Sequence, residues 1–420
     1  MKSRFRRPRR EAAAGASGGL RAGAVLDVRV ERILPGGVGL AHAEGATLFV
    51  SLAAPGDLAR VRVESTRGRA AFASIVEVLE PSNVRAEPPC PYFGRCGGCD
   101  FQQLTYGAQL AAKAEIIRDS LRRVAHTEPP DEIEVVPSPE VWRYRSRARW
   151  QHDAVRRHLG YYERGSHRVC DVAECPVAAP PVAERLLRLR EMMSEGSLPQ
   201  AAEFEAVAGD EGVALDPAVE PEDEREQLRR IGGETYRFDA GCFFQINHAL
   251  LEPLVAEGLR GTSGGGETAL DLYSGVGLFT LPLARRFQRV VAVEGHPASA
   301  VYARRNLSEA TLANARVETS AVGEWLARHA DELGRADFIL LDPPRAGAEP
   351  EAVRGIIALE PAHISYVSCD PATLARDLRQ LLDAGYRIDS LRAFDMFPQT
   401  HHVETVVHLF RADADSGRRT

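Results

Sequence analysis

Short runs in which apolar and polar positions alternate dominate the first 80 residues. The clearest runs are residues 24–30, 47–50, 59–63 and 71–79, and Pro-Gly pairs lie between them. A period of two is typical of strands with one buried face, and Gly and Pro favour tight turns. The pattern therefore predicts a small β-barrel of about five strands. Such barrels often bind single-stranded nucleic acid, although many are only structural.

The middle of the chain has a mixed pattern. Residues 105–124 place Leu110, Ile116, Ile117 and Leu121 on one side of an expected amphipathic helix. Residues 194–230 are instead dominated by acidic and small residues and contain prolines. We expect a surface-exposed connection or a weakly ordered insertion there.

The C-terminal part alternates between strand and helix patterns. Strand-like runs occupy residues 268–273, 289–293, 337–341 and 363–368, and helical patterns occupy 278–286, 296–309 and 373–384. This alternation predicts an α/β fold, a Rossmann-like doubly wound sheet whose ligands lie at the carboxyl ends of the strands. The last two runs, 386–394 and 401–410, are expected to form an antiparallel edge. We predict four regions: an arm (1–19), an OB-like β-barrel (20–82), a central α+β domain (83–235) and the α/β domain (236–420).

Composition narrows the class of protein. The chain has 420 residues, of which 44% are hydrophobic and 26% are charged, as is ordinary for a globular protein of several domains. No apolar run of about 18 residues occurs, so no membrane span is predicted. Residues 1–10 are basic but lack the apolar segment of a secretory signal. We therefore expect a disordered basic arm and a cytoplasmic protein.

Charge is distributed unevenly. The net charge of -7 argues against a uniformly basic nucleic-acid-binding protein. Eight arginines nevertheless lie between residues 143 and 168, interleaved with Trp142, Tyr144, Trp150, Tyr161 and Tyr162. Arginines hold phosphates, and aromatic side chains beside them offer stacking surfaces for bases. This stretch is a candidate RNA-binding surface, and a solvated face without a ligand is the alternative.

Cys90, Cys96 and Cys99 lie close together, and Cys170 and Cys175 follow much later. Thiols spaced in this way can converge on one metal centre, for which a fourth ligand would complete a tetrahedral set. Zinc and a four-iron cluster both accept four thiolates, and the spacing does not separate them. Disulfides are disfavoured in a chain expected to be cytoplasmic.

Cys369 is a candidate nucleophile. It follows the apolar run 363–368 and precedes Asp370 and Pro371, which are typical of a helix N-cap and first helical residue. A cysteine on such a strand-to-helix turn lies near backbone amides and the positive end of the helix macrodipole, which would stabilise a thiolate. The alternative is a buried, inert cysteine.

A glycine loop follows the first strand of the α/β domain. Gly275 and Gly277 allow a tight turn close to a ligand, and Glu294 ends the next strand, where an acid can bond ribose hydroxyls. A nicotinamide enzyme would use the acid in the same way but usually has a third glycine for the pyrophosphate. S-adenosylmethionine has no phosphate, so the sparser loop suits it better.

Two further carboxyl groups are candidate site residues. Asp342 follows a strand and is held by Pro343 and Pro344, which is typical of a site residue, although a simple turn is the alternative. Glu404 lies among apolar strand residues, where burial would raise its pKa and make it a proton acceptor. A surface glutamate is the alternative for Glu404.

Six motifs, in this order, resemble those of the bacterial RNA uracil-5 methyltransferases of the 23S ribosomal RNA type, over essentially the whole chain outside the N-terminal arm. They are the cysteine trio with Cys175-Pro176, Phe-Phe-Gln-Ile-Asn at 243–247, Asp-Leu-Tyr-Ser-Gly-Val-Gly at 271–277, Asp-Pro-Pro-Arg at 342–345, Ser-Cys-Asp-Pro at 368–371 and His-Val-Glu-Thr-Val at 402–406. The barrel likewise resembles a TRAM domain, an OB-like RNA-binding module, through Gly-Gly-Val-Gly-Leu at 36–40.

The resemblance implies roles for individual residues. Cys369 would be the nucleophile that adds to carbon 6 of uracil, and Glu404 the base that removes the proton from carbon 5. Contacts to S-adenosyl-L-methionine would come from the loop with Gly275 and Gly277 and from Gln245, Tyr273, Glu294 and Asp342. A [4Fe-4S] cluster in the central domain would be bound by Cys90, Cys96, Cys99 and Cys175, and would be architectural.

The expected function is therefore S-adenosylmethionine-dependent methylation of a uridine in 23S rRNA by a monomer. The same reaction on tRNA is an alternative, and we expect the barrel and the cysteine trio to favour rRNA. Another alternative is an RNA-binding iron-sulfur protein that has lost catalysis. Leu278 and Ala321 keep that alternative open, because they stand where the family commonly has polar residues.

Overall fold

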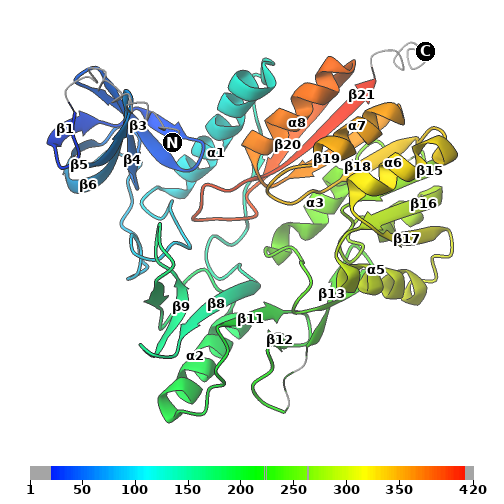
Figure 1. Ribbon diagram of the computed structural model, residues 1–420, viewed down its shortest axis with the longest axis horizontal. Helices are drawn as coiled ribbons and strands as arrows, with labels where there is room; N and C mark the ends of the chain where they lie inside the picture. Colours follow the sequence, from blue (N-terminus) through cyan, green and yellow to red (C-terminus); the bar gives the residue numbers. More distant parts are fainter. Residues whose placement is uncertain (1–19, 222, 224, 263, 412–420) are drawn as a thin grey trace, which may run out of the picture. The chain divides into compact units, whose positions relative to one another are not determined.

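The computed structural model describes residues 20–411 except 222, 224 and 263 (Figure 1). The predicted arm at 1–19 lies outside these residues. The described chain divides into two compact units, and the boundary falls near Arg85.

The first unit is a sheet of six strands in the order β1-β5-β6-β4-β3-β2. The strands are β1 (Val25–Arg29), β2 (Arg32–Leu34), β3 (Val38–Ala43), β4 (Ala46–Ser51), β5 (Leu58–Arg67) and β6 (Ala70–Glu80). In β4, buried Leu48 and Val50 alternate with less buried neighbours, as the two-residue period predicts. The buried carboxylate of Asp57 accepts hydrogen bonds from the amides of Ala54 and Ser82 and pairs with Arg85, which fixes the loop before β5.

The second unit begins with an amphipathic helix. α1 spans Tyr106–Ser120 and continues into a π-helical turn, Leu121–Ala125, which confirms the helix expected at 105–124. Ile116, Ile117 and Leu121 are buried. Ile117 and Leu121 belong to the core on one face of the large α/β sheet.

A smaller sheet lies in the centre of the chain, with strand order β10-β9-β8-β11-β12. Its strands are β8 (Arg147–Asp153), β9 (His158–Tyr162), β10 (Val169–Asp171), β11 (Glu203–Ala208) and β12 (Val213–Asp216). Helix α2 (Pro180–Glu195) packs on this sheet through Leu186 and Leu189, which share a core with Trp150 and Phe204.

The prediction of a loose connection at 194–230 was wrong. β11 and β12 lie in this segment, and β13 (Glu226–Ile231) begins there and pairs with β14 (Glu234–Asp239). Its acidic residues pair with arginines from neighbouring elements: Glu205 with Arg147 and Arg149, and Glu220 with Arg188. The high acidic content therefore reflects ion pairs on an ordered sheet.

The second unit also contains an eight-stranded sheet with the order β17-β16-β15-β18-β19-β21-β20-β7. The strands are β7 (Val135–Val136), β15 (Gly266–Leu272), β16 (Phe287–Glu294), β17 (Ala315–Thr319), β18 (Phe338–Leu341), β19 (His363–Ser368), β20 (Tyr386–Phe394) and β21 (Glu404–Arg411). β15 to β19 are parallel, and β21 is antiparallel to both β19 and β20. The predicted strands and the antiparallel edge are confirmed, whereas β17 was not foreseen.

Both faces of this sheet are covered by helices, so its central strands are continuous apolar runs (Figure 1). Residues of α3 (Leu251–Gly258), α4 (Thr280–Ala284) and α5 (Pro297–Glu309) belong to one core cluster. Residues of α6 (Val322–Leu333), α7 (Pro350–Ala358) and α8 (Pro371–Asp383) belong to the other. No helix in the described part of the chain is both long enough and apolar enough to cross a membrane.

The strand order places a site at one edge of the sheet. β15 leads outward to β16 and β17, and the chain then returns to β18 on the other side of β15. In such sheets ligands bind where the order reverses, beyond the carboxyl ends of the strands. The described architecture is therefore a mixed α/β fold with a site expected after β15, β16, β18 and β19.

The start of α8 provides a test of local stability. Asp370 caps the helix, because its carboxylate accepts hydrogen bonds from the amides of Ala372 and Thr373, each 2.9 Å long. Asp370→Ala is expected to lower the free energy of unfolding by about 1 kcal/mol, measured by urea denaturation. The matched control is Asp383→Ala at the other end of α8, where a carboxylate is unfavourable to the helix dipole. Equal destabilisation by the two substitutions would contradict the capping role.

Candidate active site

A cavity of about 660 Å³ lies at the predicted edge of the large sheet. Of the candidate catalytic and cofactor residues, seven line it: Gln245, Tyr273, Gly275, Glu294, Asp342, Cys369 and Glu404. Gly277 is not among the lining residues. Its φ of 97° and the 3.1 Å approach that a Cβ would make to Leu281 show that it is needed for the turn itself.

The pairing of β19 with β21 brings Cys369 to Glu404. The last paired residues of the two strands are Ser368 and Thr405. Continuing this register by one position places Cys369, after β19, opposite Glu404, the first residue of β21. Opposite residues of antiparallel strands have Cβ atoms about 5 Å apart. Two residues 35 positions apart in sequence thus face one cavity.

Glu404 is buried, with 1% of its surface exposed. Neither carboxyl oxygen has a hydrogen-bond partner among the described residues. Burial raises the pKa of Glu404 well above its ordinary value, the nearby Asp342 carboxyl raises it further, and Arg345 opposes both. A buried carboxyl group without partners is costly, so it is typical of a group that acts on a ligand in the cavity.

The thiol pKa of Cys369 differs from what the sequence predicted. Burial, together with the carboxyl groups of Glu404 and Asp342, raises the pKa of its thiol to about 12. The expected stabilisation of the thiolate by the helix terminus is therefore outweighed by burial and by the neighbouring carboxyl groups. The amides at the start of α8 are already bonded to Asp370, whose charge also raises the thiol pKa.

The loop after β15 has a constrained backbone. Tyr273 adopts a φ of 63° and Gly275 one of 56°, a left-handed conformation that is uncommon for residues other than glycine. Glu294 holds the loop, because its carboxylate accepts hydrogen bonds from the amides of Gly275 (2.7 Å) and His296 (2.6 Å). The Tyr273 hydroxyl donates to Glu349. Glu294 therefore shapes the loop as well as lining the cavity.

Asp342 lies directly after β18 and contacts Gln245 across the cavity wall. The Gln245 Nε2 atom donates to the Asp342 carboxylate at 3.5 Å, and the Gln245 Oε1 atom has no partner among the described residues. Burial raises the pKa of Asp342, although the hydrogen bond from Gln245 opposes this. Asp342 and Gln245 therefore offer polar groups to a ligand near Glu404.

Other lining residues were not assigned roles from the sequence. They include Phe243, His296, Arg345, Glu349 and Phe397. Leu278 and Ala321 also line the cavity, so the two departures from the family pattern lie in the site itself. Phe243 is notable because 60% of its surface is exposed. An exposed aromatic residue beside the buried Phe244, in the loop after β14, could have been the signal.

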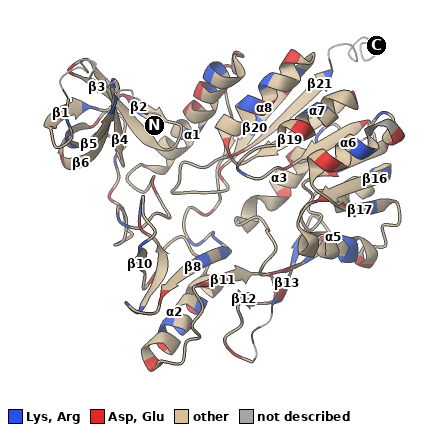
Figure 2. Ribbon diagram, in the orientation of Figure 1, with Lys and Arg blue, Asp and Glu red and all other residues tan. Residues whose placement is uncertain are grey.

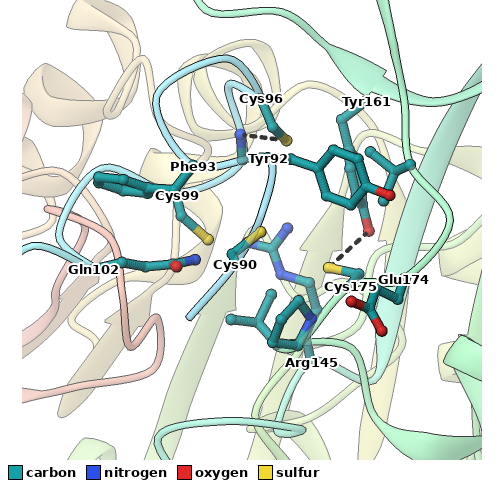
Figure 3. Close-up of a pocket in the computed structure, with 14 residues that line it drawn as sticks. Cys90, Tyr92, Phe93, Cys96, Cys99, Gln102, Arg145, Tyr161, Glu174 and Cys175 are labelled. Atoms are coloured by element: carbon teal, nitrogen blue, oxygen red, sulfur yellow. Dashed lines mark hydrogen bonds between the residues drawn. The ribbon is translucent and has the colours of Figure 1, made fainter. Parts of the chain in front are cut away.

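The four candidate metal-binding cysteines also come together. Cys90, Cys96, Cys99 and Cys175 surround a pocket that Arg145 and Tyr161 also line (Figure 3). The Tyr161 hydroxyl donates to the Cys175 sulfur at 3.8 Å, and the Gly98 amide donates to the Cys96 sulfur at 3.4 Å. Cys170 is outside this set and accepts a hydrogen bond from Arg95. Cys242 is buried elsewhere.

The spacing of these sulfurs does not suit one metal ion. Among the described residues, no group of three or more His, Cys, Asp or Glu side chains is close enough to hold a single ion. A zinc site requires four ligand atoms about 2.3 Å or less from the metal. Burial raises the pKa of Cys96 to about 11 and that of Cys99 to about 12, so a bound group would have to displace their protons.

Many arginines of the stretch 143–168 are held by other groups of the chain. Arg147 and Arg149 on β8 pair with Glu205, Arg156 with Asp153 and Arg168 with Glu163. Figure 2 shows that acidic and basic residues are interleaved along α2 beside this sheet. Binding of RNA by this stretch remains a prediction, and its charge is partly neutralised.

Comparison with known proteins identifies the family. Residues 221–412 match the model of the tRNA (uracil-5-)-methyltransferases. The 23S rRNA (uracil(1939)-C(5))-methyltransferase RlmD of Pseudomonas fluorescens is 34% identical, and the alignment covers 92% of each chain. The chain belongs to the RNA uracil-5-methyltransferase family.

Two further proteins are similar to this RNA uracil-5-methyltransferase over most of its length. An RNA methyltransferase of Streptomyces avermitilis is 36% identical over 92% of this chain and 98% of its own. The crystal structure of the tRNA (uracil-54, C5)-methyltransferase of Pyrococcus abyssi, in complex with S-adenosyl-L-homocysteine, superposes with a TM-score of 0.69. It is 26% identical and covers 91% of this chain and all of its own.

The raised pKa of Cys369 predicts slow alkylation near neutral pH. The rate of reaction with iodoacetamide should rise about tenfold per pH unit from pH 7 to 10 without a plateau, because only the thiolate reacts. Mass spectrometry of the peptide that contains Cys369 measures the rate. A synthetic peptide of residues 365–373 is the control, and its rate should level off near the ordinary pKa of 9.0. A plateau below pH 9 in the protein would contradict the assignment.

Proposed function

We propose that this RNA uracil-5-methyltransferase methylates carbon 5 of a uridine in 23S rRNA, with S-adenosyl-L-methionine as donor and a covalent bond between Cys369 and the uracil. The observation that carries the proposal is the unpartnered, buried Glu404 carboxyl facing the same cavity as the Cys369 thiol. The reaction needs a nucleophile at carbon 6 and a base at carbon 5 of one uracil ring.

The choice of rRNA rests on the relatives. The RlmD enzymes of Pseudomonas fluorescens and Thiobacillus denitrificans are both 34% identical to this chain over most of its length and act on 23S rRNA. The second candidate substrate is tRNA, which the similarity to the Pyrococcus abyssi enzyme favours. That similarity extends over 91% of the chain. The barrel and cysteine segment therefore separate the two substrates less well than we expected.

The charges of the cavity suit the donor. Glu294, Asp342, Glu349 and Glu404 contribute carboxyl groups, and Arg345 carries the one permanent positive charge among the described lining residues. S-adenosyl-L-methionine supplies a methyl group on a positively charged sulfonium, which acidic side chains attract. Glu294 and the loop at Gly275 would hold the nucleoside part, and Asp342 and Gln245 lie nearer the reacting residues.

Cys369 and Glu404 then act in sequence. The Cys369 thiol must lose its proton first, and the Asp342 carboxylate beside it would accept that proton. Glu404 then stays ionised and is free to act as the base later in the reaction. Addition of the sulfur to carbon 6 makes carbon 5 nucleophilic enough to take the methyl group. Glu404 removes the proton from carbon 5, and cleavage of the bond between sulfur and carbon 6 releases the methylated base.

The target base must leave its stack to reach Cys369. Phe243 lies at the cavity with most of its ring exposed, and is therefore placed to stack on such a base. The six-stranded sheet of the first unit would act as the TRAM-like RNA-binding module. There Phe49 stacks on Phe72 with ring centroids 5.2 Å apart, and Phe72 is 45% exposed.

Trapping with 5-fluorouridine tests the proposed chemistry. Fluorine at carbon 5 cannot be removed as a proton. In the presence of S-adenosylmethionine, 23S rRNA fragments that contain 5-fluorouridine should therefore form a denaturant-stable adduct with the protein. Cys369→Ala should abolish the adduct, and Glu404→Gln should retain it while losing turnover by about 10³-fold or more.

The same assay with tRNA transcripts compares the two candidate classes of substrate. Faster modification of tRNA than of 23S rRNA fragments would favour the second candidate. Persistence of the adduct in Cys369→Ala would show that another residue is the nucleophile. Normal turnover by Glu404→Gln would show that another group is the base.

We also propose that Cys90, Cys96, Cys99 and Cys175 bind a [4Fe-4S] cluster. The residues fit this group, because four cysteines line one pocket and cysteine thiolates are the ligands of such clusters. In a cluster each thiolate binds a different iron, so the sulfurs lie farther apart than in a zinc site. Arg145 lies in the same pocket, and its Nε atom has no partner among the described residues. Its positive charge would offset that of the thiolates.

Metal content tests this second proposal. Protein purified without oxygen should be brown, absorb near 400 nm and contain about four iron and four sulfide ions per chain. Cys99→Ser should lose most of the iron, whereas the matched control Cys170→Ser should keep it, because Cys170 bonds to Arg95 outside the set. A colourless protein with one zinc ion per chain would contradict the cluster.

A further inference from the structure

The residues between β20 and β21 form an irregular segment, residues 395–403, that leads directly into Glu404. Asp395, Met396, Phe397, Gln399 and Thr400 are all buried, with exposures of 8% or less. Phe397 lines the catalytic cavity. Because the segment has no regular secondary structure, side-chain contacts must fix its path. Together with the pairing of β21, this path sets the position of Glu404.

Helix α1 supplies two of these contacts from outside the cavity. Lys113, fully buried, pairs with the carboxylate of Asp395, and its ammonium also donates to the Phe397 carbonyl at 3.1 Å. Gln109 exchanges two hydrogen bonds with Gln399. Its Nε2 atom donates a hydrogen bond to the side-chain Oε1 atom of Gln399, and its Oε1 atom accepts one from the backbone amide of Gln399. Both bonds are 2.9 Å long. Neither Gln109 nor Lys113 lines the cavity.

The segment that follows Cys99 supplies further hydrogen bonds to residues 395–403. The carboxylate of Asp100 accepts the His401 amide at 2.8 Å, and the amides of Asp100 and Phe101 donate to the Gln399 carbonyl. Gln399 itself has a φ of 68°. Such a conformation persists only where several contacts impose it. Several hydrogen bonds and one buried ion pair therefore fix the conformation of the 395–403 segment.

These bonds are poorly explained by stability alone. Replacing a buried ion pair with apolar residues of similar volume is often neutral or stabilising. Helix α1 already packs through Ile116 and Ile117. Polar groups that fix one conformation are useful where a reacting atom must be held in place, because a displacement of 1 Å can cost about 10²-fold in rate.

We propose that Gln109 and Lys113 are positioning residues that hold Glu404 at the site of proton removal. This inference rests on the proposed function. Cys369 depends on β19 and on the cap of α8, not on the 395–403 segment. Loss of the α1 contacts should therefore slow the removal of the proton from carbon 5 and spare the addition of Cys369. The covalent intermediate would then accumulate on ordinary uridine.

Three variants test the proposal in the full-length protein. Gln109→Leu removes the exchange with Gln399, and the double variant Lys113→Met, Asp395→Leu replaces the ion pair without leaving a lone buried charge. The matched control is Gln227→Leu, which makes the same chemical change at a buried glutamine of β13 beside Gly209. The probes are a 23S rRNA fragment with ordinary uridine and the same fragment with 5-fluorouridine.

Both test variants should turn over ordinary RNA about 10 to 100 times more slowly than the unaltered protein and accumulate a denaturant-stable adduct on it. Their adduct formation with 5-fluorouridine RNA should stay within about threefold, and the control should match the unaltered protein in every assay. Unchanged turnover would overturn the proposal. So would a parallel loss of turnover and of adduct formation, since that indicates a general structural defect. If the unaltered protein forms no adduct with 5-fluorouridine RNA, the proposed function itself fails.

Discussion

The antiparallel pairing of β19 with β21 is the constraint on which the site depends. Parallel strands alone would bring Cys369, Asp342, Tyr273 and Glu294 to one edge, because each follows or ends a strand of the same direction. Glu404 begins its strand instead of ending it. Only a strand that runs the opposite way presents its first residue at that edge. A shift of the register by one residue would turn Glu404 toward the other face of the sheet.

The electrostatics of the cavity explain the raised pKa values of its two reactive side chains. Glu404 and Asp342 are placed near each other in low-dielectric surroundings, and Arg345 offsets them only in part. Each raises the pKa of the Cys369 thiol. Burial and mutual repulsion therefore shift the pKa values of the nucleophile and of the base upward, toward their neutral forms. Ligand binding has to change these protonation states, which ties reactivity to occupancy.

Local features were readable from the sequence, and contacts between distant segments were not. The apolar run before Cys369 and the Asp370 cap predict a strand and a helix because each depends on neighbouring residues. The pKa of Cys369 is raised mainly by burial and then by carboxyl groups 27 and 35 positions away, so local reasoning about the helix terminus gave the wrong direction. The segment 194–230 was misread for the same reason, since its acidic residues pair with arginines of β8 and α2. The unpartnered state of Glu404 likewise depends on what the rest of the fold leaves beside it.

The excess of carboxyl groups around the cavity has a consequence for the end of the catalytic cycle. In the proposed reaction the donor arrives with a net positive charge, and the transfer of its methyl group leaves a neutral thioether. The acidic wall therefore attracts the spent molecule less strongly than the fresh one. In this cavity the electrostatic part of the binding free energy would therefore favour the donor over its product.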